Sequence, residues 1–82
     1  MNSKIQKFAE AMQKEIDDNS RKGDWETFTD KKGIWSEFFH HLNKLESTLR
    51  KDDDPELLKE YIADCSNILM MLGNSYKLYD NE

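Results

Sequence analysis

The strongest constraint on the fold is a stripe of apolar side chains that recurs with helical spacing between residues 31 and 50. It consists of Ile34, Trp35, Phe38, Phe39, Leu42, Leu45 and Leu49. Apolar residues spaced three and four apart fall on one side of an α-helix, and a stripe this wide is typical of a helix in a bundle. A second stripe, within residues 55–73, consists of Leu57, Leu58, Tyr61, Ile62, Cys65, Ile68, Leu69 and Leu72. The two stripes predict two amphipathic helices.

Polar residues mark the expected ends of these helices. Asp54 before Pro55 is typical of an N-cap followed by proline in the first turn. A shorter apolar pattern predicts a first helix over residues 3–22, with Ser3 and Gln6 as a capping box and Gly23 as its end. Residues 23–33 are expected to form a loop whose Trp25 and Phe28 fold back onto the helices. Gly73 and Asn74 predict a stop or kink before a C-terminal piece over residues 74–80.

These elements predict an all-α fold with a single domain over residues 1–82. Only a few residues join the second and third helices, so we expect an antiparallel hairpin with the N-terminal helix beside it. The chain has no valine, one proline and three glycines, which argues against a β-sandwich or barrel.

The apolar stripes are wider than one neighbouring helix can cover, so we expect a homodimer with a four-helix core. Whether two dimers then form a tetramer is left open. The residues expected to be largely buried are Trp35, Phe38, Phe39, Leu42, Leu45, Ile62, Leu69 and Leu72.

The charge and cysteine content narrow the function classes. The formal net charge is −5 with a pI near 5.0, which argues against nucleic-acid binding and against an anionic membrane surface. No segment approaches the ~18 consecutive apolar residues of a membrane-spanning helix, and residues 1–11 lack the apolar run of a signal peptide. The single cysteine, Cys65, cannot form an internal disulfide. We therefore expect a cytoplasmic protein, in a bacterium or a phage-infected host cell.

Two groups of polar residues could carry chemistry. Glu37 precedes His40 and His41 by one helical turn, a spacing that can hold a divalent metal inside a bundle, although two partly exposed histidines explain it more simply. Glu60 and Asp64 lie one turn apart, and Asp64 is next to the apolar stripe. A carboxylate there requires a cap, an ion pair or a metal. Asn67, one turn later, is expected to be satisfied by hydrogen bonds, and Cys65 is expected to be a core residue.

Several segments resemble small MazG-like proteins, which are all-α nucleoside triphosphate pyrophosphohydrolases common in phages and bacteria. The similarity covers roughly residues 15–76, and its segments are 22–26 (KGDWE), 45–49 (LESTL), 53–56 (DDPE) and 63–71 (ADCSNILMM). The resemblance implies two acidic motifs, Glu-Glu-x-x-Glu on one helix and Glu-x-x-Asp on the next, whose carboxylates hold magnesium. The magnesium orients the triphosphate and activates a water.

This sequence departs from those motifs at all but one of their acidic positions. Residues 40–44 read HHLNK in place of the first motif, and residues 61–64 read YIAD in place of the second. Only Asp64 matches, whereas Lys44 puts a cation where a metal is expected. We therefore predict a MazG-like scaffold that has lost catalysis and needs no cofactor.

Three functions follow from this interpretation. The first is a non-catalytic interaction protein, with a phage-type inhibitor of a host protein as a special case, which binds its partner through Trp25, Tyr76 and Tyr79. The second is a metal-dependent nucleoside triphosphate pyrophosphohydrolase with Mg²⁺ or Mn²⁺ in a remodelled site. Its ligands would be Asp64, Glu60, His41 and Glu37. The third is a nucleotide-binding protein without turnover. Its contacts would be Lys44, Tyr61 and Trp25.

Overall fold

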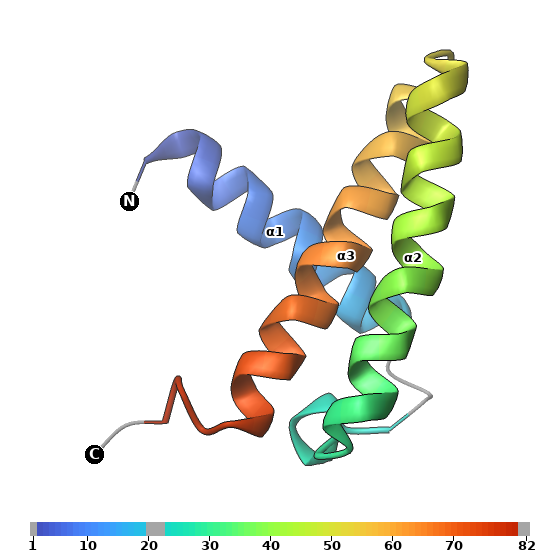
Figure 1. The fold of residues 1–82 in the computed structure, drawn as a ribbon. Helices are drawn as coiled ribbons and strands as arrows, with labels where there is room; N and C mark the ends of the chain where they lie inside the picture. Colours follow the sequence, from blue (N-terminus) through green and yellow to red (C-terminus); the bar gives the residue numbers. More distant parts are fainter. Residues whose placement is uncertain (1, 20–22, 81–82) are drawn as a thin grey trace.

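The computed structural model describes residues 2–19 and 23–80, and this part of the chain is helical without strands. It forms α1 (Ser3–Asp18), a short 3-10 helix η2 (Trp25–Thr27), α2 (Lys31–Lys51) and α3 (Pro55–Ser75). Figure 1 shows α2 and α3 side by side as an antiparallel hairpin, with α1 crossing α3. The all-α prediction and the predicted hairpin are confirmed. None of the described helices combines the length and hydropathy that crossing a membrane requires.

Aspartate side chains begin both hairpin helices. Asp30 accepts a hydrogen bond from the backbone N–H of Gly33 at 3.2 Å, and Asp54 accepts one from Leu57 at 3.0 Å. Pro55 follows Asp54 in the first turn of α3, where a missing N–H leaves no hydrogen bond unmade. The predicted start of α3 is therefore confirmed.

The start of α1 differs from its prediction. Asn2 caps the helix by accepting a hydrogen bond from Lys4 at 2.8 Å, and Ser3 already belongs to the helix. The Gln6 side chain donates to Glu10 at 3.3 Å rather than reaching back to the cap, so the predicted capping box is wrong. The helix ends at Asp18 with Asn19 as its C-cap, before the predicted end at residue 22. Residues 20–22 lie outside the described part.

Two left-handed residues end the hairpin helices. Asp52, with φ of 51°, follows α2 and donates its N–H to the Thr48 carbonyl at 3.0 Å. Lys77, with φ of 61°, follows α3 and allows Leu78 to donate to the Gly73 carbonyl at 3.2 Å. The second arrangement is a Schellman motif, which satisfies carbonyls at a helix end and reverses the chain. α3 thus continues past the predicted stop at Gly73 and Asn74, and a turn follows it.

The reversal brings Tyr79 back onto α3. Its ring lies against Gly73, because a Cβ atom built there would be 2.5–2.7 Å from the ring and hydroxyl atoms of Tyr79. The close approach therefore depends on the absence of a side chain at Gly73.

The core of the single chain is thin. Among the described residues the buried apolar side chains are Ile34, Ala63 and Cys65, and no large side chain is completely enclosed. Of the eight residues predicted to be buried, Phe38, Leu45 and Leu72 are half-buried. The other five, Trp35, Phe39, Leu42, Ile62 and Leu69, are 36–47% exposed. Within one chain that prediction is wrong for these five residues, because α1 packs against α3 and leaves much of the hairpin uncovered.

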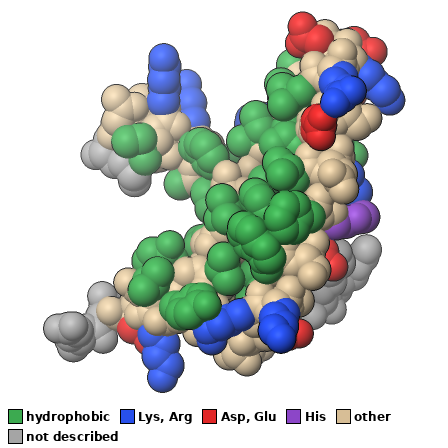
Figure 2. All heavy atoms as spheres, viewed as in Figure 1, with side chains coloured by type: hydrophobic (Ala, Val, Ile, Leu, Met, Phe, Trp, Pro, Cys, Tyr) green, Lys and Arg blue, Asp and Glu red, His purple; other side chains and the backbone are tan. Residues whose placement is uncertain are grey.

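Figure 2 shows many of the exposed apolar side chains along the hairpin and on the side of α1 that faces it. A hollow of about 300 Å³ separates α1 from the beginning of α3, and its walls include Phe8, Leu58 and Ile62. Trp25 is half-buried, as the predicted folding back of the loop requires, but Phe28 is 38% exposed, so that part of the prediction is wrong.

Candidate functional site

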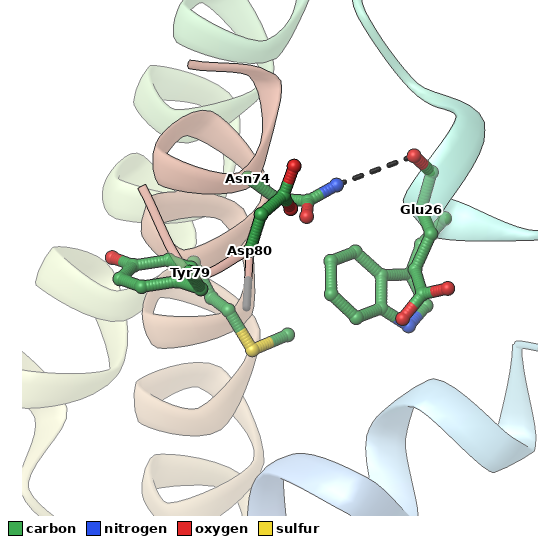
Figure 3. Close-up of a pocket in the computed structure, with 6 residues that line it drawn as sticks. Glu26, Asn74, Tyr79 and Asp80 are labelled. Carbon is green, nitrogen blue, oxygen red and sulfur yellow. Dashed lines mark hydrogen bonds between the residues drawn. The ribbon is translucent and has the colours of Figure 1, made fainter. Parts of the chain in front are cut away.

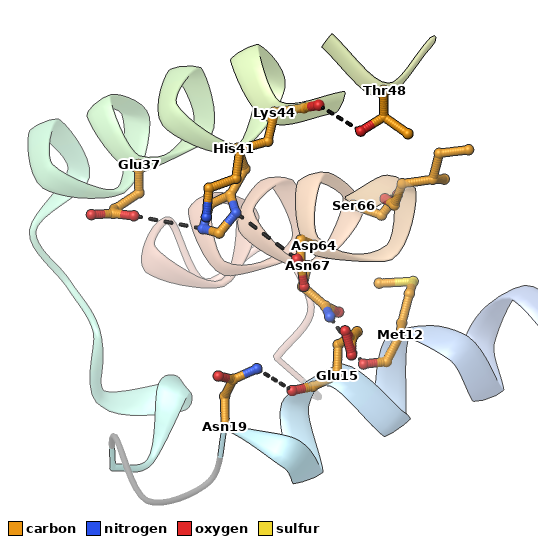
Figure 4. Close-up of polar contacts among 11 residues, drawn as sticks. Met12, Glu15, Asn19, Glu37, His41, Lys44, Thr48, Asp64, Ser66 and Asn67 are labelled. Carbon is orange, nitrogen blue, oxygen red and sulfur yellow. Dashed lines mark hydrogen bonds and ion pairs between the residues drawn. The ribbon is translucent and has the colours of Figure 1, made fainter. Parts of the chain in front are cut away.

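Five ionisable side chains from three helices form a carboxylate–histidine cluster where α1 crosses the hairpin. Glu15 of α1 and Glu60 and Asp64 of α3 each have a carboxylate oxygen within 4.8 Å of the other two. His41 of α2 places Nδ1 4.0 Å from Asp64 Oδ2, and its Nε2 lies 3.6 Å from Glu37 Oε2 (Figure 4). Of the four residues considered as metal ligands from the sequence, Glu60 and Asp64 thus converge with Glu15, whereas His41 contacts Asp64 through one ring nitrogen and Glu37 through the other.

Glu15 is not among the candidate residues named from the sequence. It lies three residues after Met12 and one before Ile16, on the apolar side of α1, and it is 8% exposed. A charged residue at a position where the helical spacing of α1 predicts an apolar one is the signal that could have identified Glu15. Burial raises the pKa of the Glu15 carboxyl, and the nearby carboxylates of Asp64 and Glu60 raise it further. The cluster therefore favours either a proton or another positive charge beside Glu15.

The surroundings of His41 favour its neutral form. Burial lowers the pKa of its imidazole, and this effect outweighs the opposite influence of the Asp64 and Glu37 carboxylates. Its buried Nδ1 has no hydrogen-bond partner in the described part of the chain. A neutral imidazole offers a lone pair that can accept a proton or bind a metal ion.

Asn67 connects the cluster to the α1–α3 contact. Its side chain is almost fully buried and donates from Nδ2 to the Met12 carbonyl at 2.9 Å (Figure 4). The Asn67 Oδ1 atom has no hydrogen-bond partner among the residues described. The sequence-based expectation of a satisfied Asn67 therefore holds for its donor but not for its acceptor.

Two other candidates have simple structural roles. Cys65 is buried, as expected for a core residue, and burial raises the pKa of its thiol, with the Asp64 charge adding to the effect. His40 is exposed and packs edge-to-face against His41 at a ring distance of 5.5 Å.

The residues considered for nucleotide binding do not form one site. Lys44 is exposed on α2, and Tyr61 is half-buried near the start of α3. Trp25 lies instead near the end of α3, where its neighbour Glu26 accepts a hydrogen bond from Asn74. Thirteen residues of helix separate Tyr61 from Asn74, a length of about 20 Å.

A second candidate site, the aromatic pocket, lies at the end of α3. It has a volume of about 630 Å³ and is lined by Trp25, Glu26, Met70, Asn74, Tyr79 and Asp80 (Figure 3). Two of the three aromatic residues considered for partner binding, Trp25 and Tyr79, thus line one pocket. The third, Tyr76, is outside the lining, and the Lys31 ammonium lies 4.7 Å from the centre of its ring.

No family model, curated protein or solved structure matches this chain. The similarity to MazG-like proteins therefore stays a sequence-based hypothesis.

Proposed function

We propose that this chain is a non-catalytic helical interaction protein that pairs with a second copy of itself and binds another protein. The observation that carries the proposal is the set of large apolar side chains left exposed on a single chain. Burial of apolar area is the main favourable term in folding and association. A chain whose described residues leave no large side chain fully enclosed therefore gains much by covering this surface.

The accessible area of the chain supports the same conclusion. A compact monomer of this mass exposes about 5200 Å². This chain exposes 6466 Å², about a quarter more than that expectation. A standard protein interface buries about 800 Å² on each partner, so the excess is large enough for one such interface.

The exposed side of α2 is the best candidate for the contact between two copies. Trp35 and Phe39 are each 47% exposed, and their rings meet edge-to-face at 5.0 Å. Phe38 stacks on Trp35 at 5.5 Å and completes a cluster of three aromatic rings. Aromatic clusters of this kind provide large contact areas with little loss of side-chain entropy.

A substitution on α2 tests the pairing. Phe39→Lys should convert a dimer at micromolar concentration into a monomer, because it places a charge in the centre of the proposed contact. Gln13→Lys adds the same charge at an exposed polar position of α1, outside the proposed contact, and should leave the dimer intact. Analytical ultracentrifugation measures the mass of each variant. A wild-type protein that stays monomeric at high micromolar concentration would contradict the proposed pairing.

Binding to another protein is proposed to use Trp25, Tyr79 and the acidic residues near them. An inhibitor of a host protein, of the kind found in phages, is one form this function could take. The test is capture of the partner from host lysate by the wild-type protein and its loss with Trp25→Ala. Phe28→Ala, at an exposed aromatic residue of the same loop, serves as the matched control. Equal capture by both variants would contradict the assigned surface.

The carboxylate–histidine cluster favours a second candidate function, metal-dependent hydrolysis of a nucleoside triphosphate. Three carboxylates with oxygens within 4.8 Å of one another suit a hard divalent cation, and the buried Glu15 would gain from a positive charge. Neutral His41 beside Asp64 suits Mn²⁺ or Zn²⁺ better than Mg²⁺. The cation would neutralise phosphate charge and activate a water. Lys44, one turn from His41, argues against a magnesium site.

Pyrophosphate release distinguishes the two functions. We expect no steady turnover of common nucleoside triphosphates with Mg²⁺, Mn²⁺ or Zn²⁺ added separately. Turnover that disappears in Asp64→Ala and is reduced in Glu15→Gln would establish the enzyme and overturn the non-catalytic proposal. Turnover that persists in Asp64→Ala would indicate a contaminating enzyme.

A further inference from the structure

The aromatic pocket is built by contacts that join distant parts of the chain. The main-chain carbonyl of Glu26 accepts a hydrogen bond from the Asn74 side chain at 3.2 Å, which fixes η2 against the end of α3. On the other wall, the Schellman motif returns the chain and Tyr79 rests on Gly73. The two segments that carry Trp25 and Tyr79 are therefore held against α3 in the unliganded chain, which limits the entropy lost on binding.

The lining of this pocket combines aromatic rings with negative charge. Trp25 and Tyr79 provide ring surfaces, Glu26 and Asp80 provide carboxylates, and no lysine or arginine occurs among the described lining residues. Figure 3 shows the labelled Tyr79, Asp80, Asn74 and Glu26 around the opening. The nearby cation Lys31 lies over Tyr76, outside the lining. A phosphate or a carboxylate ligand would be repelled here, whereas a cation would be attracted.

We propose that the aromatic pocket binds an arginine side chain from a basic segment of the protein partner. A guanidinium group is planar, stacks on aromatic faces and pairs with carboxylates through several N–H groups. The lining residues carry the groups for these contacts: aromatic rings on Trp25 and Tyr79, carboxylates on Glu26 and Asp80, and the side-chain amide of Asn74. The proposal rests on the proposed partner binding and names the chemistry that the partner presents.

Arginine fits this lining better than lysine for two reasons. The guanidinium is less strongly hydrated than an ammonium, so it loses less on entering a site lined by Trp25, Met70 and Tyr79. Its flat shape also allows stacking on a ring while its edge donates to a carboxylate. The compact ammonium group of lysine cannot contact a ring face and pair with a carboxylate at the same time.

A short peptide tests the pocket directly. The probe is acetyl-Gly-Arg-Gly-amide, titrated into the ¹⁵N-labelled full chain and followed by NMR. The neutral analogue with citrulline in place of arginine keeps the shape and removes the charge. We expect the arginine peptide to shift the indole N–H of Trp25 and the backbone amides of Glu26 and Asn74. We expect the citrulline peptide to bind at least about 5-fold more weakly, and the lysine peptide to fall between them.

Matched variants separate the pocket from the general acidity of the chain. Glu26→Gln with Asp80→Asn should weaken binding of the arginine peptide about 5-fold or more. Glu10→Gln with Asp53→Asn removes the same charge from exposed positions outside the pocket and should change binding less than 2-fold. Gly73→Ala should weaken binding while keeping the helix, because its methyl group displaces the Tyr79 ring.

Several outcomes would overturn the proposal. One is that the two double variants weaken binding of the arginine peptide equally. Another is that the NMR shifts spread over the whole acidic surface. A third is that the arginine and citrulline peptides bind equally well. Ultracentrifugation and partner capture with the unmodified chain provide the separate test of the proposed function. A chain that captures its partner but ignores the peptide would contradict this inference alone. A monomeric chain that binds the peptide would contradict the pairing alone.

Discussion

Asn67 of α3 donates a hydrogen bond from its side-chain amide to the main-chain carbonyl of Met12 on α1, across 2.9 Å and 55 residues of sequence. This bond is partly buried and lies beside Glu15, which is three residues beyond Met12 on α1. It links the N-terminal helix to the hairpin at the place where the carboxylate–histidine cluster forms. This amide therefore adds a specific polar contact to the packing of α1 on α3 that places Glu15 in the cluster.

Asn67→Ala should destabilise the protein by about 1–2 kcal/mol, because it removes a partly buried hydrogen bond between two helices. Asn67→Asp should destabilise it more, because it adds a buried negative charge near Glu15 and Asp64. Urea unfolding followed by circular dichroism measures both. Asn43→Ala, at an exposed position of α2, is the control and should change stability by less than ~0.5 kcal/mol. Equal stability of Asn67→Ala and the wild type would show that α1 is held by other contacts.

Glu15→Gln should stabilise the protein at pH 7. The pKa of Glu15 is raised in the folded chain above its ordinary value of 4.5, so folding favours the protonated form. Its contribution to stability is greatest below pH 4.5 and is lost as the pH rises through the folded pKa. We expect Glu15→Gln to raise Tm by a few degrees at pH 7, with a much smaller difference at pH 4. A lower Tm at pH 7 would mean that the ionised carboxylate has a favourable partner.

His41→Gln should reduce the loss of stability in mild acid. The pKa of His41 is lowered in the folded chain below 6.5, because burial disfavours the imidazolium. Stability is therefore lost as the pH falls from 6.5 through the folded pKa. Thermal unfolding at several pH values from 7 to 5 measures the difference between variant and wild type. A His41→Gln profile that matches the wild-type profile would contradict this account.

Asp52→Gly should stabilise the protein by about 0.5–1 kcal/mol. Asp52 adopts the left-handed conformation that glycine prefers, and its negative charge faces the negative end of the α2 dipole. The gain is partly offset by the greater freedom of glycine in the unfolded chain. Asp53, one residue later, does not adopt the left-handed conformation, so Asp53→Gly should not stabilise the protein. Chemical denaturation of the two variants gives the comparison.

The hairpin could be predicted from the sequence because its signals are local and agree with one another. Two long apolar stripes predict the two helices, and Asp54 followed by Pro55 predicts the start of α3. The cap of α1 was misplaced because Asn2 and Ser3 are both good caps, and backbone angles decide between them. Burial was overestimated because a helical period identifies the apolar face of a helix but not the surface that covers it.

The site was predicted only in part for a similar reason. His41 and Asp64 could be paired from the hairpin, since adjacent antiparallel helices bring such positions together. Glu15 depends on where α1 crosses α3, which no local pattern specifies. The return of Tyr79 to Gly73 depends on a left-handed Lys77, a conformation that few lysines adopt. Contacts made through unusual backbone angles or distant helices are those that sequence patterns describe least well.

The three-residue connection between α2 and α3 also has a kinetic consequence. Contacts across this connection close short loops, whereas the α1–α3 contact at Met12 and Asn67 closes a loop of more than 50 residues. Short loops form with a smaller entropy loss, so the hairpin should assemble in the folding transition state before α1 docks. Removing the Asn67 amide should then accelerate unfolding while leaving the refolding rate nearly unchanged. Stopped-flow measurements would resolve the two rates and establish α1 as the last helix to join.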